Sequence, residues 1–488
     1  MAIISSMDIL VYLLFILPII TIIWLAITNQ NNFNLLRTIS ITGATLILVL
    51  SLSLQIKFDF YYQFFSYYKT ICLNESLNIY YSLGIDGLSY YLILLTALLG
   101  VICIIVIWEI KYKLKEFLII LFIIEFLLLN VFCATDLLFF YIFFEAILIP
   151  MFLMIGIWGA RERRIDASYQ FFLYTFAGSV FMLIGILYIY VTTGTTHFFQ
   201  LLTFNYIKEI QIVLWLAFFI TFAVKVPMVP IHLWLPEAHT EAPTAGSVLL
   251  AGILLKLGTY GMIRFMIPLF PYATKYYTIL VFAMSIIAII FTSMTALRQG
   301  DLKKAIAYSS IAHMNLVTIG LLTNTINGIK GATFLMISHG VVSSALFILI
   351  GVIYDRYKTR NIRYYGGLTL VMPVFASIFL IHILSNMGFP GTSGFIGEFL
   401  ILLLAFNSNT LVAILATTGV VLSAAYSIWL YNRICFGGIK QMYIKLFSDT
   451  NEREFSVLAK LSVFTLVLGI YPNVILNTID HSILKIVT

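Results

Sequence analysis

Residues 215–230 read Trp215-Leu-Ala-Phe-Phe-Ile-Thr-Phe-Ala-Val-Lys225-Val-Pro227-Met-Val-Pro230, within an apolar run from Gln211 to Leu235. This run is long enough to span a bilayer, which takes about 20 apolar residues. A charged side chain at bilayer depth costs at least ~2.5 kcal/mol on insertion scales, and the two prolines break the helix beside it. We therefore predict that Lys225 has a function inside the membrane.

The composition of the whole chain indicates a membrane protein. Of 488 residues, 61% are hydrophobic and 10% are charged, and the mean hydropathy is +1.04; water-soluble domains of this size do not have such values. We expect an all-α polytopic membrane protein with about 14 transmembrane helices. The apolar segments lie near 7–27, 37–57, 84–107, 117–133, 136–158, 168–192, 211–235, 244–267, 276–297, 302–323, 329–354, 372–404, 407–432 and 456–476.

Two of these segments are interrupted by helix-breaking residues. Segment 7 breaks between Lys225 and Pro230, and segment 12 breaks where Gly and Pro recur between Met387 and Glu398. The two lie five segments apart and so run in opposite directions. Paired broken helices of this kind are typical of inverted repeats around a transport site. We therefore expect a single membrane domain, 1–488, with N-terminal helices 1–3 in 1–107, inverted five-helix repeats in segments 4–8 (117–267) and 9–13 (276–432), broken helices 7 and 12, and a last helix in 456–476.

Six ionisable residues interrupt separate apolar segments. Lysine and carboxylate side chains inside a bilayer mark proton or ion pathways, and histidine relays protons near neutral pH. We expect Glu145 to be the electrostatic partner of Lys225 and Glu398 to be the last proton carrier. The candidate proton-translocating residues are Glu145, Lys225, Lys256, His313, His339 and Glu398.

Each of these residues also has a structural interpretation. A histidine in a membrane often only bonds two helices together, Lys256 could extend to the membrane surface, and Glu145 or Glu398 could be protonated packing residues. The presence of six such residues in one chain favours the functional interpretation. For other charged residues near segment ends or without a clear partner, the structural interpretation is preferred: Asp136, Arg161, Arg163, Arg264, Glu109 and Glu125.

A polar stretch follows the first break and contains His232, Glu237, His239 and Glu241. These residue types suit zinc, but their spacing matches no helical HExxH pattern and two prolines interrupt the stretch. We expect no metal here, and we interpret the stretch as a polar loop that lines an entrance. The four cysteines form no CxxC pair, so neither a disulfide framework nor an iron–sulfur site is expected.

The charged loops predict an orientation. Alternate loops differ in basic residues, and basic loops face the cytoplasm or its mitochondrial equivalent, the matrix. The net charge of +7 is divided among short loops, which excludes a nucleic-acid surface. The basic set holds Lys111, Lys113, Lys115, Arg161, Arg163, Arg164, Arg298, Lys303, Lys304, Arg356, Lys358, Arg360, Arg363, Arg433, Lys440, Lys445 and Arg453; the opposite set holds Lys57, Lys69, Lys208, Lys275 and Lys330.

The motifs resemble those of a known family. Val224-Lys225-Val-Pro227, Leu235-Pro-Glu-Ala-His-Thr-Glu-Ala-Pro243, Leu255-Lys256-Leu-Gly258 and Phe143-Phe-Glu145-Ala together are similar to the antiporter-like membrane subunits of proton-pumping NADH:quinone oxidoreductase, respiratory complex I. The resemblance covers most of the chain, and the six candidate residues fall on the proton-channel positions of that family.

This resemblance implies a proton-translocating core subunit of the membrane arm, and hence one subunit of an enzyme whose redox chemistry lies elsewhere. NADH, FMN, iron–sulfur clusters and ubiquinone are expected in partner subunits, with no cofactor bound by this chain. The expected partners are the other membrane-arm subunits, notably antiporter-like subunits of the chain 2 and chain 5 type, and membrane lipids. The chain has no Arg-rich presequence, so we expect synthesis at the mitochondrial inner membrane, with a bacterial plasma membrane as the alternative.

Two other functions stay open at this point. A subunit of a multi-subunit sodium/proton antiporter would share the lysine and glutamate array. A passive membrane scaffold would tolerate neutral replacements of Lys225 or Glu145.

Overall fold

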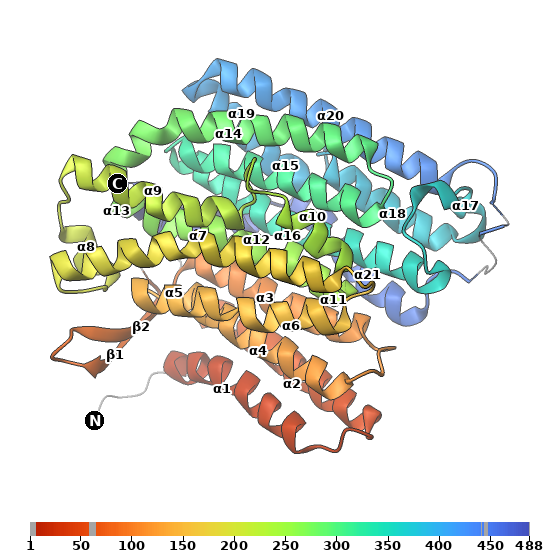
Figure 1. The fold of residues 1–488 in the computed structure, drawn as a ribbon, viewed down its shortest axis with the longest axis horizontal. Helices are drawn as coiled ribbons and strands as arrows, with labels where there is room; N and C mark the ends of the chain where they lie inside the picture. The colour runs from red at the N-terminus through yellow and green to blue at the C-terminus, as the bar shows by residue number, and fades with distance from the viewer. Residues whose placement is uncertain (1–5, 58–64, 441, 444–447, 488) are drawn as a thin grey trace. The chain divides into compact units, whose positions relative to one another are not determined.

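The computed structural model describes residues 6–57, 65–440, 442–443 and 448–487 (Figure 1). Lys445, counted above among the basic loop residues, lies outside these ranges. Within them, eleven helices are long and apolar enough to cross a membrane. A twelfth span results if α21 (Glu452–Ile470) and α22 (Asn473–Val487), which meet at 68°, are taken together. The chain is therefore a multi-pass helical membrane protein, as predicted.

The predicted count of fourteen spans exceeds these twelve because segments 7 and 12 do not form single long helices. Segment 7 ends at the break as α9 (Lys208–Lys225), which carries charges at both ends. Segment 12 appears as two short helices, α18 (Pro373–Asn386) and α19 (Ser393–Ser408). These helices are too short or too charged to qualify as independent spans by length and composition.

The chain forms two compact units. Unit 1 comprises 1–225, 257–276 and 478–488, and unit 2 comprises 226–256 and 277–477. The stretch 226–256 therefore leaves unit 1 directly after Lys225 and ends at Lys256, so both candidate lysines lie at unit boundaries along the chain.

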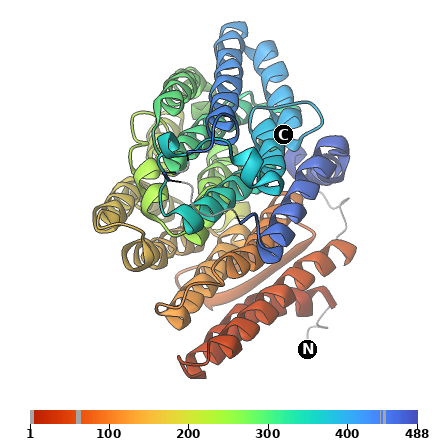
Figure 2. The ribbon, with the colours of Figure 1, turned by 90° about the vertical axis from the view of Figure 1, so that its right-hand side faces the viewer.

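Unit 1 is built from pairs of neighbouring helices. Its two N-terminal helices pack side by side, as Figure 2 shows in red. Among the others, α7 packs on both α6 and α9, and α3 packs on α4. The helices are α1 (Ser6–Ile27), α2 (Phe33–Lys57), α3 (Gly87–Val106), α4 (Leu114–Cys133), α5 (Leu137–Ala146), α6 (Leu148–Trp158), α7 (Arg164–Thr193), α8 (Phe198–Thr203), α9, a part of α12 (Leu255–Gly261), a π-helical turn (Met262–Met266), α13 (Ile267–Leu269) and the start of α14 (Pro271–Arg298).

A β-hairpin in unit 1 was not predicted from the sequence. Strands β1 (Tyr67–Asn74) and β2 (Ile79–Ile85) pair in antiparallel register, with Tyr67 opposite Ile85. The hairpin is attached to the segment after α7, because the hydroxyl of Tyr68 hydrogen-bonds Nε2 of His197. Burial lowers the pKa of His197 below its ordinary value, so the imidazole is neutral in this contact.

Unit 2 is arranged around α16 (Ile326–Tyr357), whose membrane-spanning window is fully buried. Helices α11, α15, α18, α19 and α21 all pack against it. Continuous burial explains why its sequence is apolar on every side rather than amphipathic. The remaining helices are α10 (Trp234–Glu241), α11 (Thr244–Leu249), a π-helical turn (Leu250–Leu254), α15 (Leu302–Leu322), a 3₁₀ turn (Ile362–Tyr364), α17 (Leu368–Val371), α18, α19 and α20 (Thr410–Cys435).

The structure confirms both predicted helix breaks. The first runs from Val226 to Leu233, and the amide of Asn315 donates to the freed carbonyl of Pro227 at 3.3 Å. The second runs from Met387 to Thr392 and contains Gly388 at φ +72° and Gly391 at φ +89°. Both glycines take left-handed backbone conformations that other residues rarely adopt.

Segment 5 contains a local irregularity that was not predicted. Helix α5 ends at Ala146 and α6 begins at Leu148, but Ile147 between them keeps helical dihedral angles, and 137–158 crosses as one span. Pro150 explains the irregularity, because its ring nitrogen has no hydrogen to donate to the carbonyl of Ala146. Lys225 and Glu398 therefore lie beside the two helix breaks, and Glu145 lies two residues before the irregularity at Ile147.

Candidate functional site

Lys256 and His339 are in direct contact inside unit 2. Nζ of Lys256 lies 2.8 Å from Nδ1 of His339 on α16. The same Nζ donates to the carbonyl of Ala251 at 2.5 Å. Ala251 lies in the π-helical turn Leu250–Leu254, five residues before the lysine, so the wider turn presents its carbonyl to the ammonium. Lys256 is completely buried, so its side chain does not reach the surface of the protein.

His313 and Glu398 form a second contact in the same unit. Nδ1 of His313 on α15 lies 3.2 Å from Oε1 of Glu398 on α19, and both side chains are buried. The rings of His313 and His339 have centroids 5.8 Å apart. In each ring Nε2 is buried without a hydrogen-bond partner among the described residues. Four of the six predicted residues thus follow one another as neighbours, Lys256–His339–His313–Glu398, and we call this series the unit 2 relay.

The second helix break positions the end of this relay. A Cβ atom at Gly388 would clash with Oε2 of Glu398. The left-handed turn at Gly388 therefore brings bare backbone against the carboxylate. Farther along α19, a Cβ on Gly397 would meet the backbone of Leu335 at 2.9 Å, so glycine also allows α19 to approach α16 closely.

The other two candidates lie in unit 1. Lys225 is buried at the last residue of α9, and its Nζ lies 4.5 Å from the ring centroid of Phe144, a cation–π contact. Glu145 follows Phe144 in the chain, and both of its carboxylate oxygens are buried without a hydrogen-bond partner in the part of the chain that the structure describes. The lysine and the carboxylate act on each other electrostatically, but the ammonium contacts the ring rather than forming an ion pair with Glu145.

The polar stretch after the first break is folded as α10. Glu237 forms an ion pair with Lys304 at 2.5 Å, and the ring of His239 stacks on Phe347 with centroids 4.7 Å apart. Within the described ranges, no three His, Cys, Asp or Glu side chains gather as metal ligands would. His232 and His239 both have ring nitrogens that are buried without a side-chain hydrogen-bond partner among the residues that the structure describes.

Some charged residues behave differently from the prediction. Lys303 and Arg360 were counted as loop charges, but they are only 2% and 1% exposed. Nζ of Lys303 donates to the carbonyl of Ala242 at 2.8 Å and to Ser247 at 3.2 Å, and Arg360 donates to the carbonyl of Thr240. The charged neighbours of Lys303 and Arg360 in the sequence suggested exposed loops. The signal for burial was the polar stretch with its two prolines, because a proline leaves a backbone carbonyl without an N–H partner, and a buried cation can bind such a carbonyl.

In unit 1 a buried ion pair joins Arg264 to Asp86 at 2.7 Å. Asp86 also accepts a hydrogen bond from the backbone N–H of Ser89 and caps α3. The pair supports the structural interpretation of Arg264.

Comparisons with known proteins define the class. The family described as NADH:quinone oxidoreductase/Mrp antiporter, transmembrane, matches residues 134–423. That range contains all six candidate residues and both predicted breaks. The chain belongs to this family.

Similar proteins with established names indicate which kind of family member this chain resembles. The chain is 52% identical to NADH-ubiquinone oxidoreductase chain 4 of Marchantia polymorpha, over 97% of this chain and 96% of that protein. It is also 52% identical to the protein of the same name from Chondrus crispus, over 95% of each. Among solved structures, a chain of respiratory complex I from Thermus thermophilus with bound NADH superposes with a TM-score of 0.87, at 31% identity, over 98% of this chain and 100% of that one.

Proposed function

We propose that this chain is a proton-translocating core subunit in the membrane arm of NADH:ubiquinone oxidoreductase, in the position that chain 4 occupies in its relatives. The single observation that carries the proposal is the unit 2 relay, in which a buried lysine, two histidines and a glutamate follow one another across four helical elements. Burying several titratable groups inside a membrane costs free energy, and ionisable side chains in such positions mark proton pathways.

The geometry supports a stepwise transfer. The ammonium of Lys256 gives a proton to Nδ1 of His339 and becomes a neutral amine. His339 releases a proton from Nε2, which has no hydrogen-bond partner among the described residues, and a bridging water carries it to the neighbouring His313. His313 passes a proton from Nδ1 to the carboxylate of Glu398, the last carrier. Each histidine thus accepts on one nitrogen and releases on the other.

Glu145 and Lys225 supply the electrostatic control in unit 1. A carboxylate near a buried lysine favours the charged lysine, and movement of either charge changes that preference. The cation–π contact with the Phe144 ring gives the ammonium of Lys225 a second favourable position, away from the carboxylate of Glu145. The pair is therefore suited to switch between two states as the driving signal arrives.

The energy must come from other subunits. Moving one proton against 100 mV costs about 2.3 kcal/mol, and we assign no redox group to this chain. NADH, FMN, iron–sulfur clusters and ubiquinone belong to partner subunits in this proposal. Its neighbours in the membrane arm are antiporter-like subunits of the chain 2 and chain 5 type.

We further propose fourteen spans in the mitochondrial inner membrane, with the basic loops on the matrix side. The helix breaks at Lys225 and at Gly388 occupy corresponding places in two inverted repeats, 117–267 and 276–432. The fourth helix of each repeat is the interrupted one, which is the arrangement that transport sites favour.

Affinity purification of the intact complex through a tag on this chain tests the function. NADH-oxidising and quinone-site subunits should co-purify, and reconstituted vesicles should acidify only when NADH and quinone are supplied. A sodium/proton antiporter subunit would instead yield proton flux driven by a sodium gradient without NADH, and that result would contradict the proposal.

A further inference from the structure

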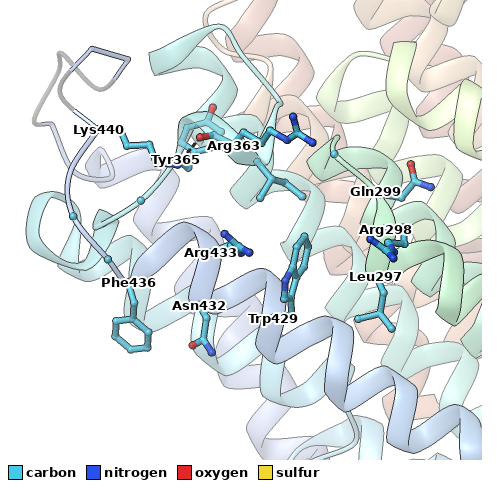
Figure 3. Close-up of a pocket in the computed structure, with 15 residues that line it drawn as sticks. Leu297, Arg298, Gln299, Arg363, Tyr365, Trp429, Asn432, Arg433, Phe436 and Lys440 are labelled. Carbon is cyan, nitrogen blue, oxygen red and sulfur yellow. Dashed lines mark hydrogen bonds between the residues drawn. The ribbon is translucent and has the colours of Figure 1, made fainter.

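A hollow of about 840 Å³ lies in unit 2 where α14 and α20 end (Figure 3). Its fifteen lining residues include four basic side chains and one tryptophan, and none of them is acidic. The basic residues are Arg298 at the end of α14, Arg363 in the 3₁₀ turn, Arg433 in the last turn of α20, and Lys440 in the following loop.

The walls of the hollow are held by backbone contacts. The N–H of Ile362 donates to the carbonyl of Gly300 at 2.9 Å, and the N–H of Gly367 donates to that of Phe436 at 3.0 Å. Gly367 has φ +66°, and a Cβ there would meet the carbonyl of Gly437 at 2.8 Å. The segments that contribute Arg363 and Lys440 are therefore fixed next to the ends of α14 and α20. The site is formed before any ligand arrives.

The four cations are available to a ligand. Arg298, Arg363, Arg433 and Lys440 are exposed, and none of them is in an ion pair with a carboxylate among the described residues. Lys440 donates to the carbonyl of Arg363, and the guanidinium of Arg433 lies 5.7 Å from the ring centroid of Trp429. Figure 3 shows Trp429 and Arg433 on one wall and Arg298 on the other. Guanidinium groups that line one hollow and form no ion pair with a described carboxylate suit a phosphate, which arginine binds in a bidentate manner.

Apolar surface continues from the hollow along both helices. Met294 and Phe291 lie about one and two turns before Arg298 and are exposed, and Val421 lies two turns before Trp429 and is 71% exposed. Spacings of three, four and eight residues place these side chains on the faces that lead away from the hollow. The two helices touch where Gly419 faces Ile289. Tryptophan and arginine at the end of a span are typical of the membrane–water interface.

We propose that this hollow binds the phosphodiester headgroup of an anionic membrane lipid, with its acyl chains along the exposed faces of α14 and α20. Arg363 and Arg433 hold the phosphate, Trp429 marks the level of the glycerol backbone, and Lys440 closes the outer rim. Basic pockets between transmembrane helices bind such headgroups for these electrostatic reasons. The site is separate from the unit 2 relay and does not depend on proton translocation.

Photolabelling of the purified, delipidated complex tests the proposal. The probes are photoreactive phosphatidylglycerol and phosphatidylcholine with identical acyl chains, and the readout is the label on the peptide that contains 429–440. Phosphatidylglycerol should label this peptide roughly ten-fold more than phosphatidylcholine, since several basic contacts favour the anionic headgroup. This comparison uses the unaltered complex, so it tests the proposal even if a variant fails to assemble.

Two further experiments identify the side chains that bind and show whether the ligand is a lipid or free phosphate. The double variant Arg363→Gln and Arg433→Gln should lose the preference by roughly ten-fold, while Lys358→Gln, at a lysine 71% exposed and outside the hollow, should keep it. Millimolar inorganic phosphate should not displace the lipid, because it lacks acyl chains. Equal labelling by both lipids, displacement by free phosphate, or no label because an acidic segment of a neighbouring subunit covers the hollow would each overturn the proposal.

Discussion

Nζ of Lys256 lies 2.8 Å from Nδ1 of His339, and neither side chain reaches the surface. The two residues are 83 positions apart in the chain, and each would be costly alone in a membrane interior. Their contact places two separate buried groups within hydrogen-bonding distance of each other, and we propose that they exchange a proton. If they act as one unit, removing either should have the effect of removing both.

A double-mutant cycle examines this pair. Lys256→Met and His339→Leu should each lower NADH-driven proton transport by on the order of 10²-fold, the usual effect of losing a proton-transfer group. The double variant should be no worse than either single one, because residues in one network are not additive. The measurement is vesicle acidification by complexes shown to be assembled on native gels. Independent, multiplying effects would mean that the two residues act in different steps.

The glycine beside Glu398 gives a matched pair of variants. Gly388→Ala and Gly391→Ala both force a left-handed alanine, which costs roughly 1–2 kcal/mol each. Only the Gly388 change pushes a methyl group into the Glu398 carboxylate, since nothing lies within 4 Å of a Cβ at Gly391. Both variants should lose similar thermal stability, but only Gly388→Ala should lose proton transport. Equal transport in the two variants would remove Gly388 as a positioning residue.

Lys225 should be required for pumping but not for assembly. Lys225→Ala removes the buried ammonium at the first helix break, whereas Lys208→Ala removes an exposed lysine from the start of the same helix. Proton transport should fall strongly in the first variant and stay near normal in the second. Glu145→Gln should impair transport more than Glu145→Asp, because the charge matters more than the reach of the side chain. Normal pumping by an assembled Lys225→Ala complex would end its proposed role.

The buried ion pair of unit 1 predicts a stability effect. Asp86→Ala leaves the guanidinium of Arg264 buried without its carboxylate, which should cost roughly 3–5 kcal/mol. Lys69→Ala removes the partly exposed partner of Asp8 and should change the stability far less, because solvent screens an exposed ion pair. Thermal denaturation, with release of this chain from the complex as the readout, gives a midpoint for each variant complex. A similar midpoint for both would show that the Arg264–Asp86 contact contributes little.

The hairpin should loosen in acid. Burial lowers the pKa of His197, so the unfolded segment binds a proton more readily than the folded one. The stability of the Tyr68–His197 contact is therefore present above the ordinary histidine pKa, near 6.5, and is lost as the pH falls below it. Hydrogen exchange of the amides in 67–85, corrected for intrinsic rates, should accelerate between about pH 7 and pH 5. His197→Gln should abolish the pH dependence, and an unchanged profile in that variant would assign it to another group.

The sequence predicted the class, both helix breaks and five buried ionisable residues, with the half-buried Glu145 as the sixth candidate, because bilayer physics restricts where charges and prolines occur. It did not predict that Lys225 contacts the Phe144 ring or that Lys256 reaches Ala251, since these contacts depend on tertiary packing and on a π-helical turn. Lys303 and Arg360 were misread as loop charges because local composition does not report burial. The hairpin was missed since its short strands lie between much stronger helical signals.

Proton counting in reconstituted vesicles tests the central claim, that the unit 2 relay moves protons. The quantity is the number of protons transported per NADH oxidised, compared between the unaltered complex, the Lys256→Met complex and a control, Lys358→Met, at an exposed lysine. The control should keep both the ratio and the oxidation rate. The Lys256→Met complex should show a lower ratio, or a coupled loss of oxidation and transport. An assembled Lys256→Met complex with the normal ratio and the normal oxidation rate would contradict the relay.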